Sequence, residues 1–140
     1  MNKFEMVEET PVVEKYNELR VLGTLRPIDR NLAKIGLRHS LYAVSFYHED
    51  TLVAMGRVVG DMGIIFYLQD VIVHPNYQNM GLGTKVISNL LNYIKGFKPE
   101  NGEIMVGLMS SMGKESFYEK HGFFRRPNNN YGNGMSLIIK

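Results

Sequence analysis

Residues 64–85 read IIFYLQDVIVHPNYQNMGLGTK, an apolar run that leads through a proline to two glycines separated by one residue. The run from Ile64 to Val73 is almost unbroken, which is typical of a strand buried on both faces. After the glycines, apolar residues recur at helical spacing from Val86 to Ile94, and Gly96 stands where a helix would end. The stretch therefore predicts a strand, a short connection and a helix.

Two glycines between a strand and a helix are also typical of a phosphate-binding loop. Gly81 and Gly83 let backbone N–H groups approach an anion without a Cβ in the way, and the helix N-terminus adds partial positive charge. The connection lacks the G-x-x-x-x-G-K-[ST] pattern of a Walker A loop. It also lacks the G-x-G-x-x-G fingerprint of a dinucleotide site, because Val86 stands where the third glycine would be. Two interpretations stay open on this pattern alone: an anion cradle, or a tight turn whose glycines only relieve strain.

The rest of the chain predicts a mixed α/β sheet with helices covering its faces. Thr10 as N-cap and Pro11 as first residue indicate one helix, and a second follows Asp29. Strands are expected at 40–47 and 51–59, joined as a hairpin, and Asp61 begins the next turn. Further strands are expected at 103–109 and 134–140, with a short helix over 114–122 and an Asn- and Gly-rich loop between them.

Composition limits the function classes. A chain of 140 residues suits a single domain, 1–140, and no apolar run approaches the roughly 20 residues of a membrane span. There is no cysteine and no His/Asp/Glu spacing of a metal site, and a net charge of +2 does not indicate nucleic acid. The N-terminus lacks a secretory pattern. We expect a cytoplasmic protein with no metal, nucleic-acid or membrane partner.

Two linked motifs make the chain resemble the Gcn5-related N-acetyltransferase (GNAT) superfamily. The first is QDVIVHPNYQNMGLGTKVI at 69–87, where Gln78 to Gly83 match [QR]-x-x-G-x-[GA]; the second is FYEKHGF at 117–123. The resemblance covers the C-terminal half, and the order of the earlier elements fits as well. It implies a mostly antiparallel central sheet with helices on both faces, in which the parallel strands 64–73 and 103–109 splay apart.

The resemblance implies acetyl-coenzyme A as donor. Backbone groups of Val71, Ile72 and Val73 would pair with the pantetheine amides, and ligands of open α/β sheets do bind beyond the carboxyl ends of strands. The pyrophosphate would be wrapped by the amides of Gln78, Asn79, Met80, Gly81, Leu82, Gly83 and Thr84. Phe117 would contact the cofactor, and Lys114 would meet the 3′-phosphate or else remain a solvated lysine.

Tyr118 occupies the tyrosine position of the second motif, where relatives place a general acid beside the coenzyme A sulfur. Its ordinary pKa of about 10 keeps it protonated at neutral pH, so it can donate to a departing thiolate. The alternative is an aromatic packing residue whose hydroxyl only hydrogen-bonds the cofactor. Acetyl transfer in this superfamily is direct, with both substrates bound together.

No general base is evident. Relatives that carry one on the first splayed strand place it on the face that Tyr67 and Gln69 would share, and neither is a base at neutral pH. We expect an ordered water held there, or an amine that arrives deprotonated. Asp70 is predicted on the opposite face as a structural carboxylate hydrogen-bonded to backbone, unless a bulge turns it.

The acceptor is expected to be a primary amine of a small molecule. Arg26 and Arg126 could clamp a carboxylate or phosphate on it and Tyr131 could stack on it, although surface arginines and a mobile loop explain the same residues. The alternative function is an acetyl-coenzyme A sensor or interaction domain with little transfer activity; a nucleotide hydrolase ranks third because a Walker lysine is missing. A homodimer is plausible.

Overall fold

A five-stranded sheet forms the centre of the first of two units in this chain. The computed structural model describes residues 3–140, and within them the chain forms two units, 3–107 and 108–140. The sheet order is β1 (Glu5–Val7), β2 (Tyr42–His48), β3 (Thr51–Gly60), β4 (Phe66–Val73) and β5 (Val106–Gly107). Neighbouring strands are antiparallel except the parallel pair β4 and β5. The predicted mixed, mostly antiparallel sheet is confirmed.

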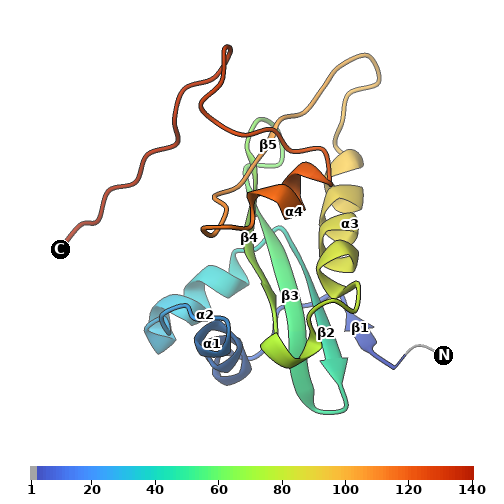
Figure 1. Ribbon diagram of the computed structural model, residues 1–140, viewed down its shortest axis with the longest axis vertical. Coiled ribbons are helices and arrows are strands. Elements are labelled where there is room, and N and C mark those ends of the chain that lie inside the picture. The colour runs from blue at the N-terminus through green and yellow to red at the C-terminus, as the bar shows by residue number, and fades with distance from the viewer. Residues whose placement is uncertain (1–2) are drawn as a thin grey trace. The chain divides into compact units, whose positions relative to one another are not determined.

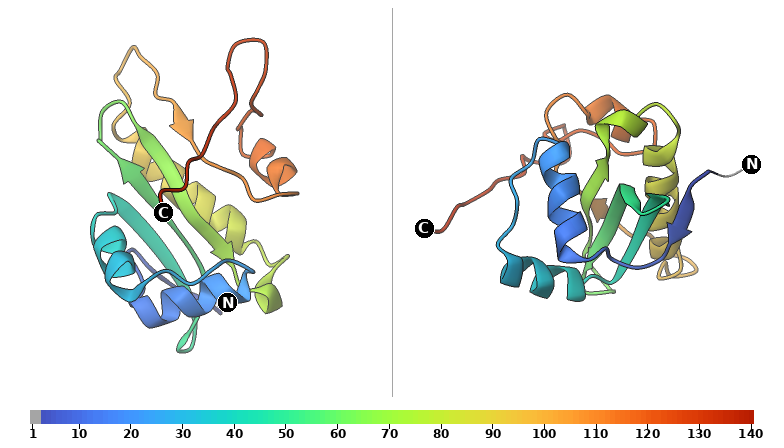
Figure 2. Two further views of the ribbon diagram at one scale, coloured as in Figure 1. Left: turned by 90° about the vertical axis from the view of Figure 1, so that its left-hand side faces the viewer. Right: turned by 90° about the horizontal axis from the view of Figure 1, so that it is seen from below.

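Helices cover both faces of this sheet (Figures 1 and 2). On one face lie α1 (Val13–Leu22) and α2 (Arg30–Arg38), and on the other lies α3 (Leu82–Lys95). The first face has a buried cluster that includes Tyr16 and Leu19 of α1 and Met55 and Ile72 of the strands. The predicted helices on both faces are confirmed, and the sheet between them is shielded from water.

The two N-terminal helices differ in how their first turns are capped. Asp29 caps α2, its carboxylate accepting hydrogen bonds from two backbone N–H groups of the first turn, as predicted. The prediction for α1 is wrong: Val12, not Thr10, is the N-cap residue, and it has no capping side chain. The Ser45 hydroxyl of β2 donates to the Glu9 carbonyl at 2.7 Å, so the segment before α1 is bound to the sheet. The helix begins only after this segment, at Val13.

The turn at Asp61 makes β4 shorter than the predicted strand 64–73. The Asp61 carboxylate accepts hydrogen bonds from the N–H groups of Gly63, Ile64 and Ile65, and these bonds lower the pKa of Asp61. Ile64 and Ile65 therefore belong to the turn and are exposed, so β4 begins at Phe66 rather than at Ile64. Along β4, buried residues alternate with half-buried ones and none is exposed, as expected for a strand covered on both faces.

The second unit contains one short helix, α4 (Glu115–Glu119), which is shorter than the predicted range 114–122. Its chain reverses at Gly122, where a φ of +94° ends the helical path. Two predicted strands also differ. Of residues 103–109 only β5 forms a strand, and residues 134–140 form none, because a strand needs a partner edge and no described segment pairs with them.

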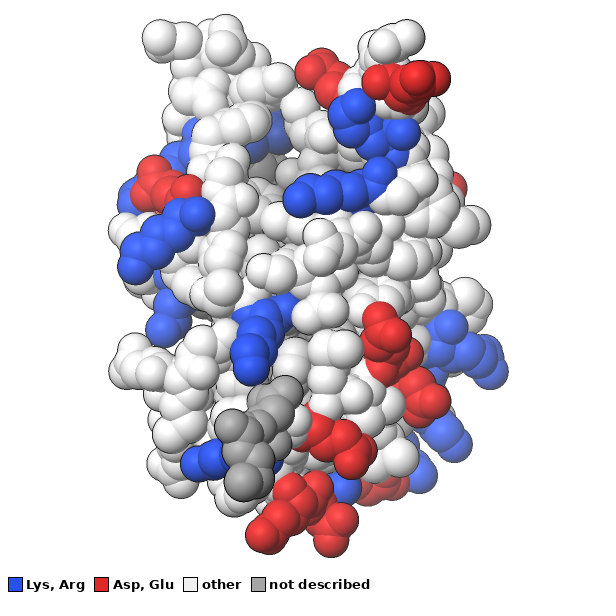
Figure 3. Space-filling view, turned by 90° about the vertical axis from the view of Figure 1, so that its right-hand side faces the viewer, with Lys and Arg blue, Asp and Glu red and all other residues white. Residues whose placement is uncertain are grey.

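Charge is mixed over the face that carries β1 and α3. Figure 3 shows lysine and arginine side chains interspersed with aspartate and glutamate there, with the acidic groups denser toward the end near the N-terminus. Among residues 3–140, no helix has the length and apolar composition to cross a membrane.

Gly56 allows the close approach of α3 to the sheet. A Cβ at this position would lie 2.5 Å from Val86 Cγ1 and 2.9 Å from Leu90 Cδ1, both on α3. We expect Gly56→Ala to lower the free energy of unfolding by about 1–3 kcal/mol, because an overpacked core must shift to fit the methyl group. Urea denaturation followed by circular dichroism measures this loss. Gly63→Ala is the matched control, since its Cβ would meet only Asp61 Oδ1, at 3.8 Å. Equal losses in both variants would contradict the close approach.

Candidate active site

One edge of β4 is free over most of its length. β3 pairs with β4 along the strand, but β5 pairs with it only through Phe66 and Tyr67. No other strand within the described part of the chain pairs with this edge, so the backbone from Leu68 to Val73 is available to a ligand that pairs as a strand does. The predicted contacts Val71, Ile72 and Val73 all lie on it. The Ile72 side chain is buried in the α1 cluster, so only its backbone can meet a ligand.

A β-bulge interrupts β4 at Asp70. The register between β3 and β4 shifts so that Asp70 and Val71 both stand opposite Gly56. Asp70 has a φ of +56°, in the left-handed region that few non-glycine residues adopt. The extra residue breaks the alternation of side chains, so Gln69 and Asp70 face the same side of the sheet. The prediction that Asp70 faces away from Tyr67 and Gln69 is therefore wrong.

Asp70 is held by side chains, not by backbone as predicted. Its Oδ2 accepts hydrogen bonds from the Tyr16 hydroxyl and from Arg57 Nε, and its Oδ1 accepts one from Arg20 Nη1, each at 2.8 Å. The Asp70 side chain is 1% exposed and the two arginine side chains 12%. Gln69 Nε2 lies 3.5 Å from Oδ1. Both oxygens of this carboxylate are thus engaged by side chains of α1 and β3, so Asp70 is structural.

Tyr67 and Gln69 remain on the α1 and α2 side of the sheet, both half-buried. Gln69 stands opposite Arg57, whose Nη1 donates to the Gly36 carbonyl at the end of α2. Neither Tyr67 nor Gln69 is a base, and the one carboxylate beside them is occupied. This face therefore offers hydrogen-bonding groups for a water molecule rather than a side-chain base.

The connection after β4 forms a concave run of backbone. The His74 ring accepts from the Asn76 N–H, so His74 caps the single 3-10 turn Pro75–Tyr77. Asn79 and Gly81 then have φ values of +61° and +82°, and a Cβ on Gly81 would meet nothing within 4 Å. Backbone of alternating hand points successive N–H groups into one concavity, which suits an anion.

The first turn of α3 continues this run. Gly81 is its N-cap residue with no capping side chain, and helix geometry leaves the first amides without an intrahelical acceptor. The Leu82 side chain is 1% exposed, so it anchors the turn in the core while its backbone stays at the surface. Residues 78–84 thus follow the open edge of β4 after one 3-10 turn and lead into the first turn of α3, and the cradle predicted there stays a prediction. Open edge and cradle together fit an extended ligand that carries a pyrophosphate.

In the second unit, Tyr118 is half-buried on α4. Burial raises its pKa above the ordinary tyrosine value, which keeps the phenol protonated at neutral pH. Its ring contacts those of Phe117 and Phe123, at 5.2 and 5.9 Å between centroids. No hydrogen-bond partner of its hydroxyl lies among residues 3–140. Phe117 is half-buried beside it, and Lys114 is exposed as the N-cap residue of the helix.

The predicted acceptor residues separate into two places. Arg126 and Tyr131 lie together in the second unit: the guanidinium carbon stands 5.4 Å from the Tyr131 ring centroid, and Arg126 Nε donates to the Gly132 carbonyl. The Asn128 side chain accepts from the Tyr131 N–H, so hydrogen bonds order this loop. Arg26 belongs to the first unit and is exposed, and its carbonyl accepts from Arg20 Nε.

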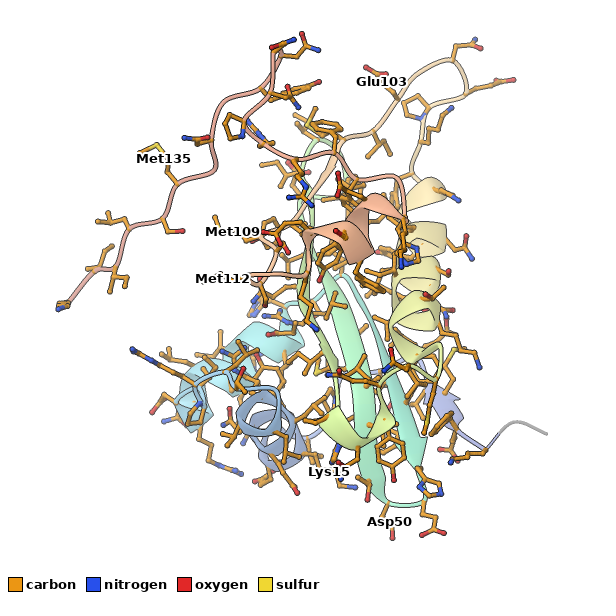
Figure 4. The ribbon with its side chains drawn as sticks, viewed as in Figure 1. Lys15, Asp50, Glu103, Met109, Met112 and Met135 are labelled. Carbon is orange, nitrogen blue, oxygen red and sulfur yellow. The ribbon has the colours of Figure 1, made fainter. Side chains whose placement is uncertain are left out.

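A small hollow of about 90 Å³ lies between α1 and the beginning of β3. Its lining includes Leu19, Leu22 and the ring of His74, and the Lys15 ammonium donates to the Asp50 carbonyl at 2.6 Å across its rim (Figure 4). Ligand sites for drug-sized molecules are generally several hundred Å³. This hollow is therefore too small for a coenzyme.

Sequence reasoning missed the group formed by Tyr16, Arg20, Arg57 and Asp70. Two signals were present: a charged residue inside an apolar strand, which requires partners when buried, and a glycine inside the neighbouring strand, which often marks a bulge. The direction in which Asp70 points depends on the register between β3 and β4, and this register cannot be read from a single sequence.

Known proteins are similar to this chain in sequence and in fold. A family model of the acetyltransferase (GNAT) domain matches residues 39–125. The "Uncharacterized N-acetyltransferase ycf52-like" of Prochlorococcus marinus is 32% identical over 91% of this chain and 70% of its own length. The "Uncharacterized N-acetyltransferase ycf52" of Porphyra purpurea is 31% identical over 73% of the chain, which spans 58% of that relative.

A solved structure is similar over nearly its whole length. This is a protein of meticillin-resistant Staphylococcus aureus, described as "Probable Acetyltransferase", with a TM-score of 0.87, 30% identity and coverage of 97% of this chain and 99% of that one. An acetyltransferase of the GNAT family from Streptococcus pneumoniae has a TM-score of 0.79 at 24% identity, with 98% of each chain covered. The second likeness supports the fold alone.

The Tyr16 hydroxyl makes the group around Asp70 sensitive to high pH. Burial first, and then the charge and hydrogen bond of Asp70, raise the pKa of Tyr16 to about 12. An unfolded tyrosine titrates near 10, so the stability that Tyr16 contributes is complete below pH 10 and is lost as the pH rises to 12. We expect the difference in free energy of unfolding between wild type and Tyr16→Phe to be constant near neutral pH and to shrink over this interval.

Urea denaturation at a series of pH values measures that difference. Tyr93→Phe, which keeps Tyr16, is the control and should lose stability in parallel with wild type. If the free energies of unfolding of wild type and Tyr16→Phe change in parallel between pH 10 and 12, the raised pKa of Tyr16 is contradicted.

Proposed function

The chain belongs to the GNAT acetyltransferase family, and from that premise we propose that it transfers the acetyl group of acetyl-coenzyme A directly to a primary amine of a small molecule. The observation that carries the donor half is the continuity of the open β4 edge with the backbone cradle from Gln78 to Thr84. The edge suits the amides of pantetheine, and the cradle suits the pyrophosphate. The cytoplasmic location stays a prediction.

Acetyl-coenzyme A supplies a thioester whose carbonyl carbon an amine can attack directly. The chain's contribution begins with position: backbone of Val71 to Val73 would hold the pantetheine arm, and the cradle would fix its far end. Holding two reactants in register can lower a barrier by about 7 kcal/mol or more. Lys114 and Phe117 are proposed as further contacts of the coenzyme.

Tyr118 is proposed to give its phenolic proton to the departing thiolate as the carbon–sulfur bond breaks. Its raised pKa keeps that proton in place at neutral pH, and its hydroxyl is not engaged by another described residue. The proton that the amine loses passes to a water molecule. Tyr67 and Gln69 are proposed to hold this water, because their side chains share one face of β4 and neither can act as the base itself.

The acceptor is proposed to meet Arg26, Arg126 and Tyr131. Arg126 is already fixed over the Tyr131 ring, with its terminal nitrogens left for an anionic group on the acceptor. One observation favours the second candidate, an acetyl-coenzyme A sensor with little transfer activity. Asp70, the carboxylate on the open strand β4, already has both oxygens paired with arginines.

Replacing Tyr118 with Phe tests the acid. We expect kcat to fall about 100-fold or more, since a positioned general acid typically contributes that much. The measurement is release of free thiol from acetyl-coenzyme A with a panel of amines. Tyr93→Phe removes a tyrosine hydroxyl from α3 and should leave kcat unchanged. A wild-type rate in Tyr118→Phe would remove the acid role. Wild-type protein that binds coenzyme A but releases no free thiol with any amine of the panel would favour the sensor.

Replacing Gly81 with Ala tests the cradle. The new Cβ would occupy the open space in front of the backbone, and its φ of +82° disfavours any side chain. We expect coenzyme A affinity, measured by titration calorimetry, to fall at least about tenfold. The Cβ would keep the ligand from the backbone, and a preference of about 1–2 kcal/mol against positive φ would turn the amides of this loop away from it. Gly122→Ala is matched in strain, with a φ of +94° and open space, and should bind normally. Identical affinities in the two variants would exclude the cradle.

A further inference from the structure

The open edge of β4 is closed at one end by β5. The two parallel strands pair only where Phe66 stands opposite Val106 and Tyr67 opposite Gly107, and Figure 2 shows β5 beside the beginning of β4. Beyond Tyr67 no strand of the described chain covers this edge. A ligand that lies along the edge can therefore extend only as far as the junction of β4 and β5.

The side chain of Tyr67 covers this junction on the α1 and α2 side of the sheet. A Cβ added to Gly107 would lie 3.8 Å from Tyr67 Cδ2, so the ring reaches across to β5. The Tyr67 hydroxyl has no hydrogen-bond partner within residues 3–140. No buried side-chain oxygen there lacks one, so this hydroxyl must reach the surface. The ring thus forms a wall at the closed end of the edge.

The proposed donor would lie along this edge with its acyl group toward the wall. The cradle predicted at 78–84 follows Val73, so a pyrophosphate bound there brings the pantetheine arm to Val73 first and to Val71 next. The thioester is at the far end of that arm, so it comes beyond Val71 and nearer to Tyr67. This direction rests on the proposed function.

The distance between Val71 and Tyr67 matches the length of an acetyl thioester. Val71 stands opposite Gly56 and Tyr67 opposite Val59, and three strand rises of about 3.3 Å place these levels about 10 Å apart. From the last pantetheine amide to the acetyl methyl, a zigzag of about five bonds spans roughly 7 Å. Contact with a ring takes about 3.5 Å more. An acetyl group paired in this way just reaches the Tyr67 ring, and each further methylene would collide with it.

We propose that Tyr67 restricts the donor to acetyl-coenzyme A by closing the acyl end of the site. Its ring stands where the outer carbons of a longer acyl group would lie, and Gly107 leaves the space through which the ring reaches β5. One methylene in a close-fitting pocket is worth about tenfold or more in discrimination. The phenol has two separate parts in this arrangement: the ring excludes acyl carbons, and the hydroxyl is left to hold water.

Titration calorimetry with acetyl-coenzyme A and butyryl-coenzyme A tests the wall. Wild type should bind the acetyl form at least about tenfold more tightly, because butyryl adds two methylenes. Tyr67→Val removes the ring with a residue that suits a strand, and it should bind the two forms equally. Tyr93→Val, the control, truncates another half-buried tyrosine, on α3, and should keep the wild-type ratio.

Coenzyme A without an acyl group separates the wall from the donor site itself. It should bind wild type and Tyr67→Val alike, because it lacks the carbons that meet the ring. If wild type does not bind coenzyme A, the proposed donor fails and the wall fails with it. If coenzyme A binds, then equal affinity of wild type for the two acyl forms, or a wild-type ratio in Tyr67→Val, overturns the wall alone.

Tyr67→Phe distinguishes the ring from the hydroxyl, and it removes only one oxygen atom should Tyr67→Val fail to fold. The ring remains, so the ratio of the two affinities should equal that of wild type. In the thiol-release assay its kcat with acetyl-coenzyme A should fall, because the hydroxyl proposed to hold the water is gone. Loss of the affinity ratio in Tyr67→Phe would assign the selectivity to the hydroxyl and overturn the ring as the wall.

Discussion

The buried carboxylate of Asp70 is the interaction on which the rest of the first unit depends. Moving a carboxylate out of water costs several kcal/mol unless its oxygens are bound, and here a phenol and two guanidinium groups bind them. The donors come from α1 and β3, so the carboxylate joins a helix to two strands. Arg20 and Arg57 extend the connection, because each also donates to a carbonyl of the α1–α2 connection or α2. Loss of the carboxylate would leave two buried cations without their anion.

The bulge that presents Asp70 also determines the shape of the candidate site. Because Asp70 and Val71 share one partner, Val71 returns to the α3 side, where it packs near Gly56 and Val86. The close packing of α3 that glycine permits places the beginning of that helix, and with it the cradle, directly after the strand. The left-handed backbone at Asp70 therefore affects both the strand edge proposed to bind pantetheine and the amides proposed to bind a pyrophosphate.

Sequence patterns predicted those elements whose cause is local. The helix cap at Asp29, the turn at Asp61 and the glycine connection before α3 each depend on residues within a few positions, and the structure has all three. The direction of Asp70 was mispredicted because alternation assumes a regular strand, whereas the bulge depends on pairing with β3. The strands expected at 103–109 and 134–140 failed for a related reason: a strand is a property of two segments, and periodicity describes only one.

The same distinction explains why the donor is easier to infer than the acceptor. The donor half consists of backbone: a free strand edge and a run of amides whose geometry requires glycine at one position and tolerates many side chains elsewhere. Such a site leaves a pattern of strand and glycines that can be recognised in one sequence, here at Gly81 and Gly83. The acceptor half consists of side chains such as Arg126 and Tyr131, whose selectivity depends on the exact placement of each group. Family membership therefore identifies an acetyltransferase, the backbone supports the proposed donor, and the identity of the amine has to come from the side chains themselves.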